Sequence, residues 1–224
     1  MSGVSVPPRL KGLRAFLGRL GRDRSGVAFI EMAYAAPFLM LLGLGGVEVA
    51  NYAIIHMRVS QLAVSLADNA SRAKQEVVSG VPRMREVDVN EAFTAAIVQA
   101  GQLDVAANGR LILSSLEVND EGGQWIHWQR CFGEAPYASS YGEQGDGAEG
   151  TELAGMGPAG RQVQAETGYA IMFAEVSYEY QPIMLGDFIE DRRISKVAAM
   201  FVRDNRDLSQ LFNPAPGAAV NDCD

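Results

Sequence analysis

The pattern of apolar and polar residues separates one long apolar stretch near the start of the chain from a mixed remainder. The 29 residues from Val27 to Ile55 are almost all apolar or small. As a helix this stretch would be about 43 Å long, more than the roughly 30 Å hydrocarbon core of a bilayer. A cleavable signal peptide fits poorly, because only six residues, 27–32, precede the small-residue motif at 33–35. The pattern predicts a transmembrane helix over 27–55.

The helical pattern continues beyond this apolar stretch. Apolar residues recur three and four positions apart, with polar residues between them, at Tyr52, Ile55, Val59, Leu62, Leu66, Ala70, Ala73 and Val77. This spacing is typical of an amphipathic helix. We therefore expect one helix from Val27 to about Val78, with a kink at Pro37, which lacks the amide hydrogen that a helix interior needs.

A second, shorter helix is predicted from Asp88 to Leu103. Asp88 would be its N-cap, and Glu91 follows three residues later, as in a capping box. Apolar residues inside this segment fall on one side of the helix. It should therefore pack against the rest of the domain.

The next segments change to patterns that are typical of strands. Residues 110–118 and 125–132 are predicted to form a hairpin around the turn "NDEGGQ", which contains the Asp and Gly that tight turns need. Residues 169–180 and 192–204 are two further strand candidates, although 194–200 fits a helix equally well. The predicted fold class is α+β: a long N-terminal helix packs its apolar stripe on a small antiparallel sheet.

Two segments are predicted to lack packed structure. Residues 142–160 contain seven glycines and four acidic residues but no basic residue, a composition typical of a mobile loop. A calcium site is disfavoured there, because the alternating ligand pattern of a calcium loop is missing. The tail, 213–224, should be extended or disordered unless Cys223 holds it.

Charge is distributed unevenly along the chain. Residues 1–26 carry six basic side chains and one aspartate, so they contribute +5 to a total of −8 and leave −13 for the rest. A basic flank beside an apolar span favours the cytoplasmic side. The sequence thus predicts a basic cytoplasmic leader (1–26), an inner-membrane span (27–55), a periplasmic α+β domain (56–212) and the tail. Such an acidic domain would repel nucleic acid.

The two cysteines, Cys131 and Cys223, both fall in the proposed periplasmic part. In an oxidising compartment such a pair tends to form a disulfide. The alternative is two unrelated thiols, with Cys223 loose in the tail. A catalytic cysteine is disfavoured, because only His127 lies near Cys131 in sequence.

Residues suited to catalysis or metal binding are few. The chain has only two histidines, His56 and His127. In a strand, His127 and Cys131 would be roughly 13 Å apart, too far to share a zinc ion. The charged residues around Asp187, Glu190 and Asp191 fit a solvated turn. No catalytic or nucleotide-binding motif occurs, so the sequence predicts neither an enzyme nor a cofactor.

Two carboxylates, Glu31 and Glu48, lie within the apolar stretch. Carboxylates inside a bilayer are costly, and they usually pair with a cation or mark a function. Glu48 is near the outer end and could reach interfacial water. Glu31 is further from water and needs a cationic partner.

The segment "RSGVAFIEMAYAAPFLMLLGLGGVEVANYAIIHMRVSQLAVSLADNASR" resembles the N-terminal signature of TadE-like pseudopilins, which are minor components of the tight adherence (Flp) pilus machinery. The shared features are the basic flank, Gly26, the short apolar stretch to Glu31, Pro37, and Glu48 followed by an Ala-rich amphipathic helix. The resemblance covers roughly residues 22–73. Beyond it, the chain matches only in outline.

The resemblance implies processing by a prepilin peptidase between Gly26 and Val27. Glu31 would then be the fifth residue of the mature chain and would pair with a freed α-amine. The implied function is to initiate or assemble a pilus by helix packing, with other pilins or pseudopilins, the Tad inner-membrane platform and membrane lipid as partners.

Two other functions stay open from the sequence. The chain could be an uncleaved, membrane-tethered binding or adhesin-like module that acts through its loop at 133–162. A tethered periplasmic enzyme is the weaker alternative, because it would need a polar pocket that the sequence does not reveal.

Overall fold

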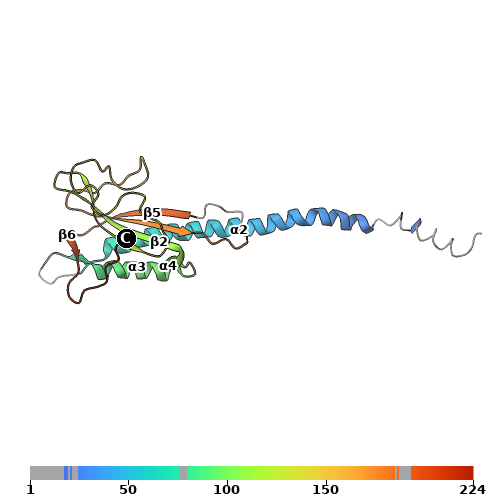
Figure 1. Ribbon diagram of the computed structural model, residues 1–224, viewed down its shortest axis with the longest axis horizontal. Coiled ribbons are helices and arrows are strands. Elements are labelled where there is room, and N and C mark those ends of the chain that lie inside the picture. The colour runs from blue at the N-terminus through green and yellow to red at the C-terminus, as the bar shows by residue number, and fades with distance from the viewer. Residues whose placement is uncertain are drawn as a thin grey trace, which may run out of the picture. The chain divides into compact units, whose positions relative to one another are not determined.

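The computed structural model describes residues 18–19, 21, 25–75, 80–184, 186 and 193–223. The fold is α+β, with a long apolar N-terminal helix and a small antiparallel sheet, as the sequence predicted (Figure 1). The chain divides into two units, residues 1–49 and 50–224. The predicted charged turn at 187–191 and most of the leader lie outside the described residues.

Helix α2, Ser25–Arg72, is a single helix of 48 residues that continues through Pro37. It ends about six residues before the predicted end near Val78. Residues 76–79 lie outside the described residues. The last turn of α2 has a specific partner, because the Arg206 guanidinium donates to the carbonyl oxygen of Ser71 at 2.7 Å. This bond satisfies one of the carbonyls that a helix end leaves without an intrahelical donor.

The sheet of the second unit contains four antiparallel strands in the order β3-β2-β4-β5. Their bounds are β2 Gly109–Val118, β3 Gln124–Phe132, β4 Ile171–Glu179 and β5 Arg193–Phe201. The predicted hairpin is confirmed as β2 and β3, and the ambiguous segment at 194–200 is a strand. β5 pairs with β4 over its whole length, so sheet pairing decides a choice that local periodicity left open.

One face of the sheet packs against helices. Val59, Leu62 and Leu66 of α2 are fully or almost fully buried in a core that also contains Leu111 and Leu113 of β2. Helix α3, Glu86–Ala100, adds Phe93 and its apolar neighbours to the same core. The short helix α4, Val105–Asn108, follows α3 and leads directly into β2. The predicted packing of the amphipathic helix on the sheet is confirmed.

The start of α3 differs from the predicted start. Its N-cap is Arg85 rather than Asp88, and the Arg85 backbone N–H donates to Asp88 Oδ2 at 2.9 Å, so Asp88 occupies the third helical position. The short strand β1, Arg83–Arg85, immediately precedes the helix and keeps Arg85 extended. The helix ends at Ala100 rather than Leu103, because Gly101 adopts a positive φ of 61°.

The opposite face of the sheet is covered by the long connection between β3 and β4. Met156 from this connection is fully buried with Leu116, Ile126 and Phe173 in a second apolar core. Asn119 fixes the glycine-rich part, because its side-chain amide donates to the carbonyl oxygens of Gly147 and Gly150, each at 2.8 Å. The prediction of a loop without packed structure at 142–160 is therefore wrong.

A second, two-stranded sheet was not predicted. β1 pairs in parallel with β6, Asp207–Phe212, and the Arg83 guanidinium lies 5.2 Å from the centre of the Phe212 ring. The two strands are over 120 positions apart in the sequence. Because β1 has only three residues, its pattern is too short to identify it as a strand.

The C-terminal tail is held in place through Cys223. Cys131 on β3 and Cys223 form a disulfide with a Cα–Cα distance of 4.9 Å, which confirms the predicted pair. The Cys131 N–H also donates to the carbonyl oxygen of Asn221 at 2.9 Å, so the tail covers part of the outer edge of β3. The sequence predicted an ordered tail only if Cys223 held it, and the disulfide does hold it.

Candidate functional site

Two parts of the structure have features of a functional site: the N-terminal part of α2 and a cavity beside the disulfide. The first contains the residues that the sequence singled out. The second was not predicted.

The N-terminal part of α2 exposes an apolar surface over its whole length. The exposed large side chains, each about 70% or more exposed, include Phe29, Tyr34, Phe38, Leu41 and Leu42. A surface of this extent is not stable in water and indicates burial in a membrane or against other proteins. By length and composition, α2 could form a single membrane span.

The predicted processing residues lie at the beginning of this helix. Gly26 is the second residue of α2, Val27 is half exposed, and Glu31 is exposed one turn further along. A Cβ atom added to Gly26 would meet nothing within 4 Å. The fold therefore does not require glycine at this position, so any requirement for glycine must come from something other than folding.

Glu48 differs from Glu31 in its surroundings. Its side chain is only 3% exposed, whereas Glu31 is exposed. In this structure protein atoms rather than solvent surround Glu48, so the expected contact with interfacial water is not seen. The two carboxylates therefore cannot be treated as equivalent packing residues.

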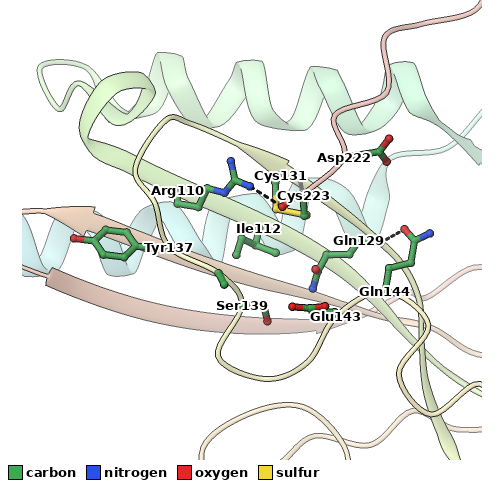
Figure 2. A pocket seen from close by; sticks show the side chains of 11 residues that line it. Arg110, Ile112, Gln129, Cys131, Tyr137, Ser139, Glu143, Gln144, Asp222 and Cys223 are labelled. Carbon is green, nitrogen blue, oxygen red and sulfur yellow. Dashed lines mark hydrogen bonds between the residues drawn. A yellow bond between two sulfur atoms is a disulfide. The ribbon is translucent and has the colours of Figure 1, made fainter.

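The cavity lies between the sheet, the tail and the connection that follows β3, and its volume is about 600 Å³. Figure 2 shows the disulfide and the Arg110 side chain close together among the lining residues. The full lining consists of Arg110, Ile112, Gln129, Cys131, Tyr137, Ala138, Ser139, Glu143, Gln144, Asp222 and Cys223. It is polar and carries both signs of charge.

Most of the polar groups of this cavity already have protein partners. The Arg110 guanidinium donates to the carbonyl oxygens of Gly133 at 2.9 Å and Cys223 at 3.1 Å. The Gln144 side-chain oxygen accepts from the Gln129 N–H at 3.0 Å, as the dashed line in Figure 2 shows. These bonds hold the cavity wall together, whereas the buried Nε of Arg110 has no hydrogen-bond partner among the described residues.

A buried carboxylate lies behind the cavity wall. Burial raises the pKa of Glu175 on β4, although the Ser139 hydroxyl and the Ser140 N–H both donate to this carboxylate and act in the opposite direction. The group fastens the connection to the sheet. Its bonds to the two serines position the wall residue Ser139.

The remaining candidate residues form no metal site. His127 Nδ1 lies 2.9 Å from Glu117 Oε2, and its ring stacks on Trp125 with centroids 4.0 Å apart. Within the described ranges, no three His, Cys, Asp or Glu side chains gather closely enough to hold a metal ion. Cys131 is in the disulfide and has no free thiol.

Sequence reasoning did not identify the cavity residues. Arg110 and Gln129 lie on neighbouring strands, and Asp222 is over 90 residues further along the chain. The one signal in the sequence was the pair of cysteines, which brings the tail to β3. The polar residues that surround the pair give no motif of their own.

The structure thus defines an α+β protein with a long apolar N-terminal helix, a small antiparallel sheet and a disulfide-bonded tail. The chain matches no protein-family model, no curated protein and no solved structure.

Proposed function

We propose that this protein is a TadE-like minor pseudopilin that helps to initiate or assemble a Tad/Flp-type pilus in the inner membrane. One observation carries the proposal: α2 is one uninterrupted helix whose first part exposes apolar side chains and whose later part forms the core of the folded domain. Such a helix couples a folded domain to packing among helices in a membrane. The N-terminus would be cytoplasmic and the domain periplasmic.

In this proposal, prepilin peptidase cleaves between Gly26 and Val27. The new α-ammonium group and the Glu31 carboxylate then form a charge pair within the bundle of packed helices. Burying either charge alone in a poorly solvated site is expensive, whereas the pair offsets much of that cost. The pair would therefore fix the register of this helix against those of other pilins and the membrane platform.

The test uses one substitution at each of two glycines. Gly26→Ile should block processing and leave a precursor that is heavier by residues 1–26. Gly18→Ile, in the leader, is the matched control, because a Cβ atom at either glycine would meet nothing within 4 Å. Mass spectrometry of the N-terminus checks both variants, and equal processing of the two would contradict the proposed cleavage site.

Glu31→Gln tests the pairing step. The amide keeps the shape of the side chain but cannot neutralise an α-ammonium group, so we expect processed, membrane-inserted protein that does not support pilus assembly. Met32→Leu is the control at the next position. Normal pili from the Glu31→Gln variant would exclude the charge pair and leave a simple membrane anchor.

A tethered binding or adhesin-like module is the second candidate, and the cavity of about 600 Å³ supports it. Its exposed rim residues Glu143 and Gln144 come from the connection after β3. If this function is correct, Glu143→Ala should reduce surface attachment while pilus formation stays normal. Loss of pili with this variant would argue against it.

A further inference from the structure

The segment that follows β4 places two exposed apolar side chains near the C-terminal end of the proposed span of α2. Ile183 is 56% exposed and Met184 is 48% exposed. They come three and four residues after Tyr180, which is fully buried. Singly scattered exposed apolar side chains are normal on a protein surface, but here two large ones are adjacent in the chain.

The position of this segment along α2 is fixed by side-chain contacts. The Asn51 side-chain amide donates to the Tyr180 hydroxyl at 2.9 Å, and the Tyr52 ring meets the Tyr180 ring edge-on with centroids 5.0 Å apart. Three residues of extended chain reach at most about 11 Å, so Ile183 cannot lie far from this level of the helix.

The same level of α2 is where its exposed apolar surface ends. Tyr52, Ile54 and Met57 are exposed, and beyond them the only exposed large apolar residue of the helix is Val64. Arg58 follows Met57 and is also exposed. Tyrosine followed by a basic residue at the end of an apolar helix is typical of the interface between lipid and water.

We propose that Ile183 and Met184 form a second membrane contact, which inserts into the lipid interface beside the end of the transmembrane part of α2. This inference rests on the proposed membrane insertion of α2. The occupant is lipid rather than another protein, because the apolar pair lies level with the end of the apolar helix surface. Interfacial elements bury apolar side chains about 5–10 Å deep, which is within reach of this short segment.

The contact would hold the folded domain against the membrane surface. A single helix leaves a domain free to tilt about the point where the chain leaves the bilayer. A second contact on a neighbouring segment limits this motion. The domain would then present a defined side to neighbouring subunits.

The experiment places single tryptophans in the full-length protein, reconstituted in phosphatidylcholine–phosphatidylglycerol vesicles that contain brominated lipid. Ile183→Trp should lose most of its added fluorescence, more with bromine near the headgroups than with bromine near the chain ends. Val81→Trp is the matched control: Val81 is 54% exposed and precedes β1, beyond the far end of α2, so it should keep its fluorescence. Wild-type protein supplies the background from Trp125 and Trp128.

Phe38→Trp, within the proposed span, distinguishes a failure of the second contact from a failure of the membrane span itself. Quenching of Phe38→Trp with no quenching of Ile183→Trp would overturn the second contact and leave the span intact. No quenching at either position would overturn both. Non-reducing mass analysis of the Cys131–Cys223 bond in each variant confirms that the domain has folded.

Discussion

The Arg130 guanidinium on β3 donates to the Glu86 carboxylate in the first turn of α3, with its Nε 3.0 Å from each carboxylate oxygen. Both side chains are buried, at 10% and 3% exposure. The pair joins the start of a helix to the edge strand of the sheet across 44 positions of sequence. Asp222 from the tail lies 3.5 Å from the same guanidinium, so three segments meet at Arg130.

Removing one member of this pair should strongly destabilise the domain. Glu86→Gln leaves the Arg130 charge buried without its main partner, which should lower the free energy of unfolding by about 3–5 kcal/mol. Chemical denaturation measures the change. Asp68→Asn removes the exposed pair with Arg72 and is the control, with an expected loss below about 1 kcal/mol. Equal losses in both variants would contradict the role given to burial.

Loss of the disulfide should destabilise the protein and release the tail. The bond closes a loop between residues 92 positions apart, which corresponds to about 4–5 kcal/mol in the loop-entropy model. Cys131→Ser and Cys223→Ser should therefore unfold at lower denaturant concentration, and both should be insensitive to a reductant. The reduced wild type should match them. If the wild type is equally stable with and without reductant, the disulfide does not stabilise the protein and the prediction is refuted.

The glycine-rich connection should contribute to stability, contrary to the prediction from its composition. Met156→Ala removes a fully buried side chain from the second core and should cost about 2–5 kcal/mol. Glu149→Ala, at an exposed position in the same connection, should change stability by no more than about 0.5 kcal/mol. Thermal unfolding of the two variants checks the difference, and a stable deletion of 142–160 would contradict it.

Asp204 should make part of the stability depend on pH. Burial alone would raise the pKa of Asp204, but hydrogen bonds and charge from Arg206 and Lys74 outweigh it and hold the pKa below its ordinary value of 3.8. A carboxyl whose pKa is lower in the folded state stabilises the fold above its ordinary pKa. This contribution disappears as the pH falls through the lower, folded-state value.

The substitution Asp204→Asn tests this dependence. The variant should be less stable than wild type near pH 7 by about 1–3 kcal/mol, because Asp204 accepts two hydrogen bonds from the almost fully buried Arg206. Urea unfolding at a series of pH values should show the two proteins converging in acid. A difference that stays constant down to the most acidic pH at which both proteins still fold would exclude the lowered pKa.

Membrane orientation can be checked with reporter fusions. A periplasm-active enzyme fused to the C-terminus should be active, since the six basic residues before Gly26 favour a cytoplasmic N-terminus. The same enzyme fused before residue 1 should be inactive. An intact but inactive C-terminal fusion would reverse the orientation.

The sequence by itself determined the elements whose patterns are long. The amphipathic stripe that includes Val59, Leu62 and Leu66 identified the later part of α2, and the turn at 119–124 identified the hairpin of β2 and β3. These features depend on residues that are close together in the chain. The two cysteines also predicted their bond, because an even pair in one compartment limits the alternatives.

Only the tertiary structure decided how distant segments combine. Composition suggested that 142–160 would stay unpacked, yet Met156 is buried because the sheet offers an apolar face on that side. The pairing of β1 with β6 and the bond between Arg130 and Glu86 join residues with no shared local pattern. Local periodicity reports which side of an element is apolar, whereas the partner of that side depends on long-range packing, which no short stretch of sequence encodes.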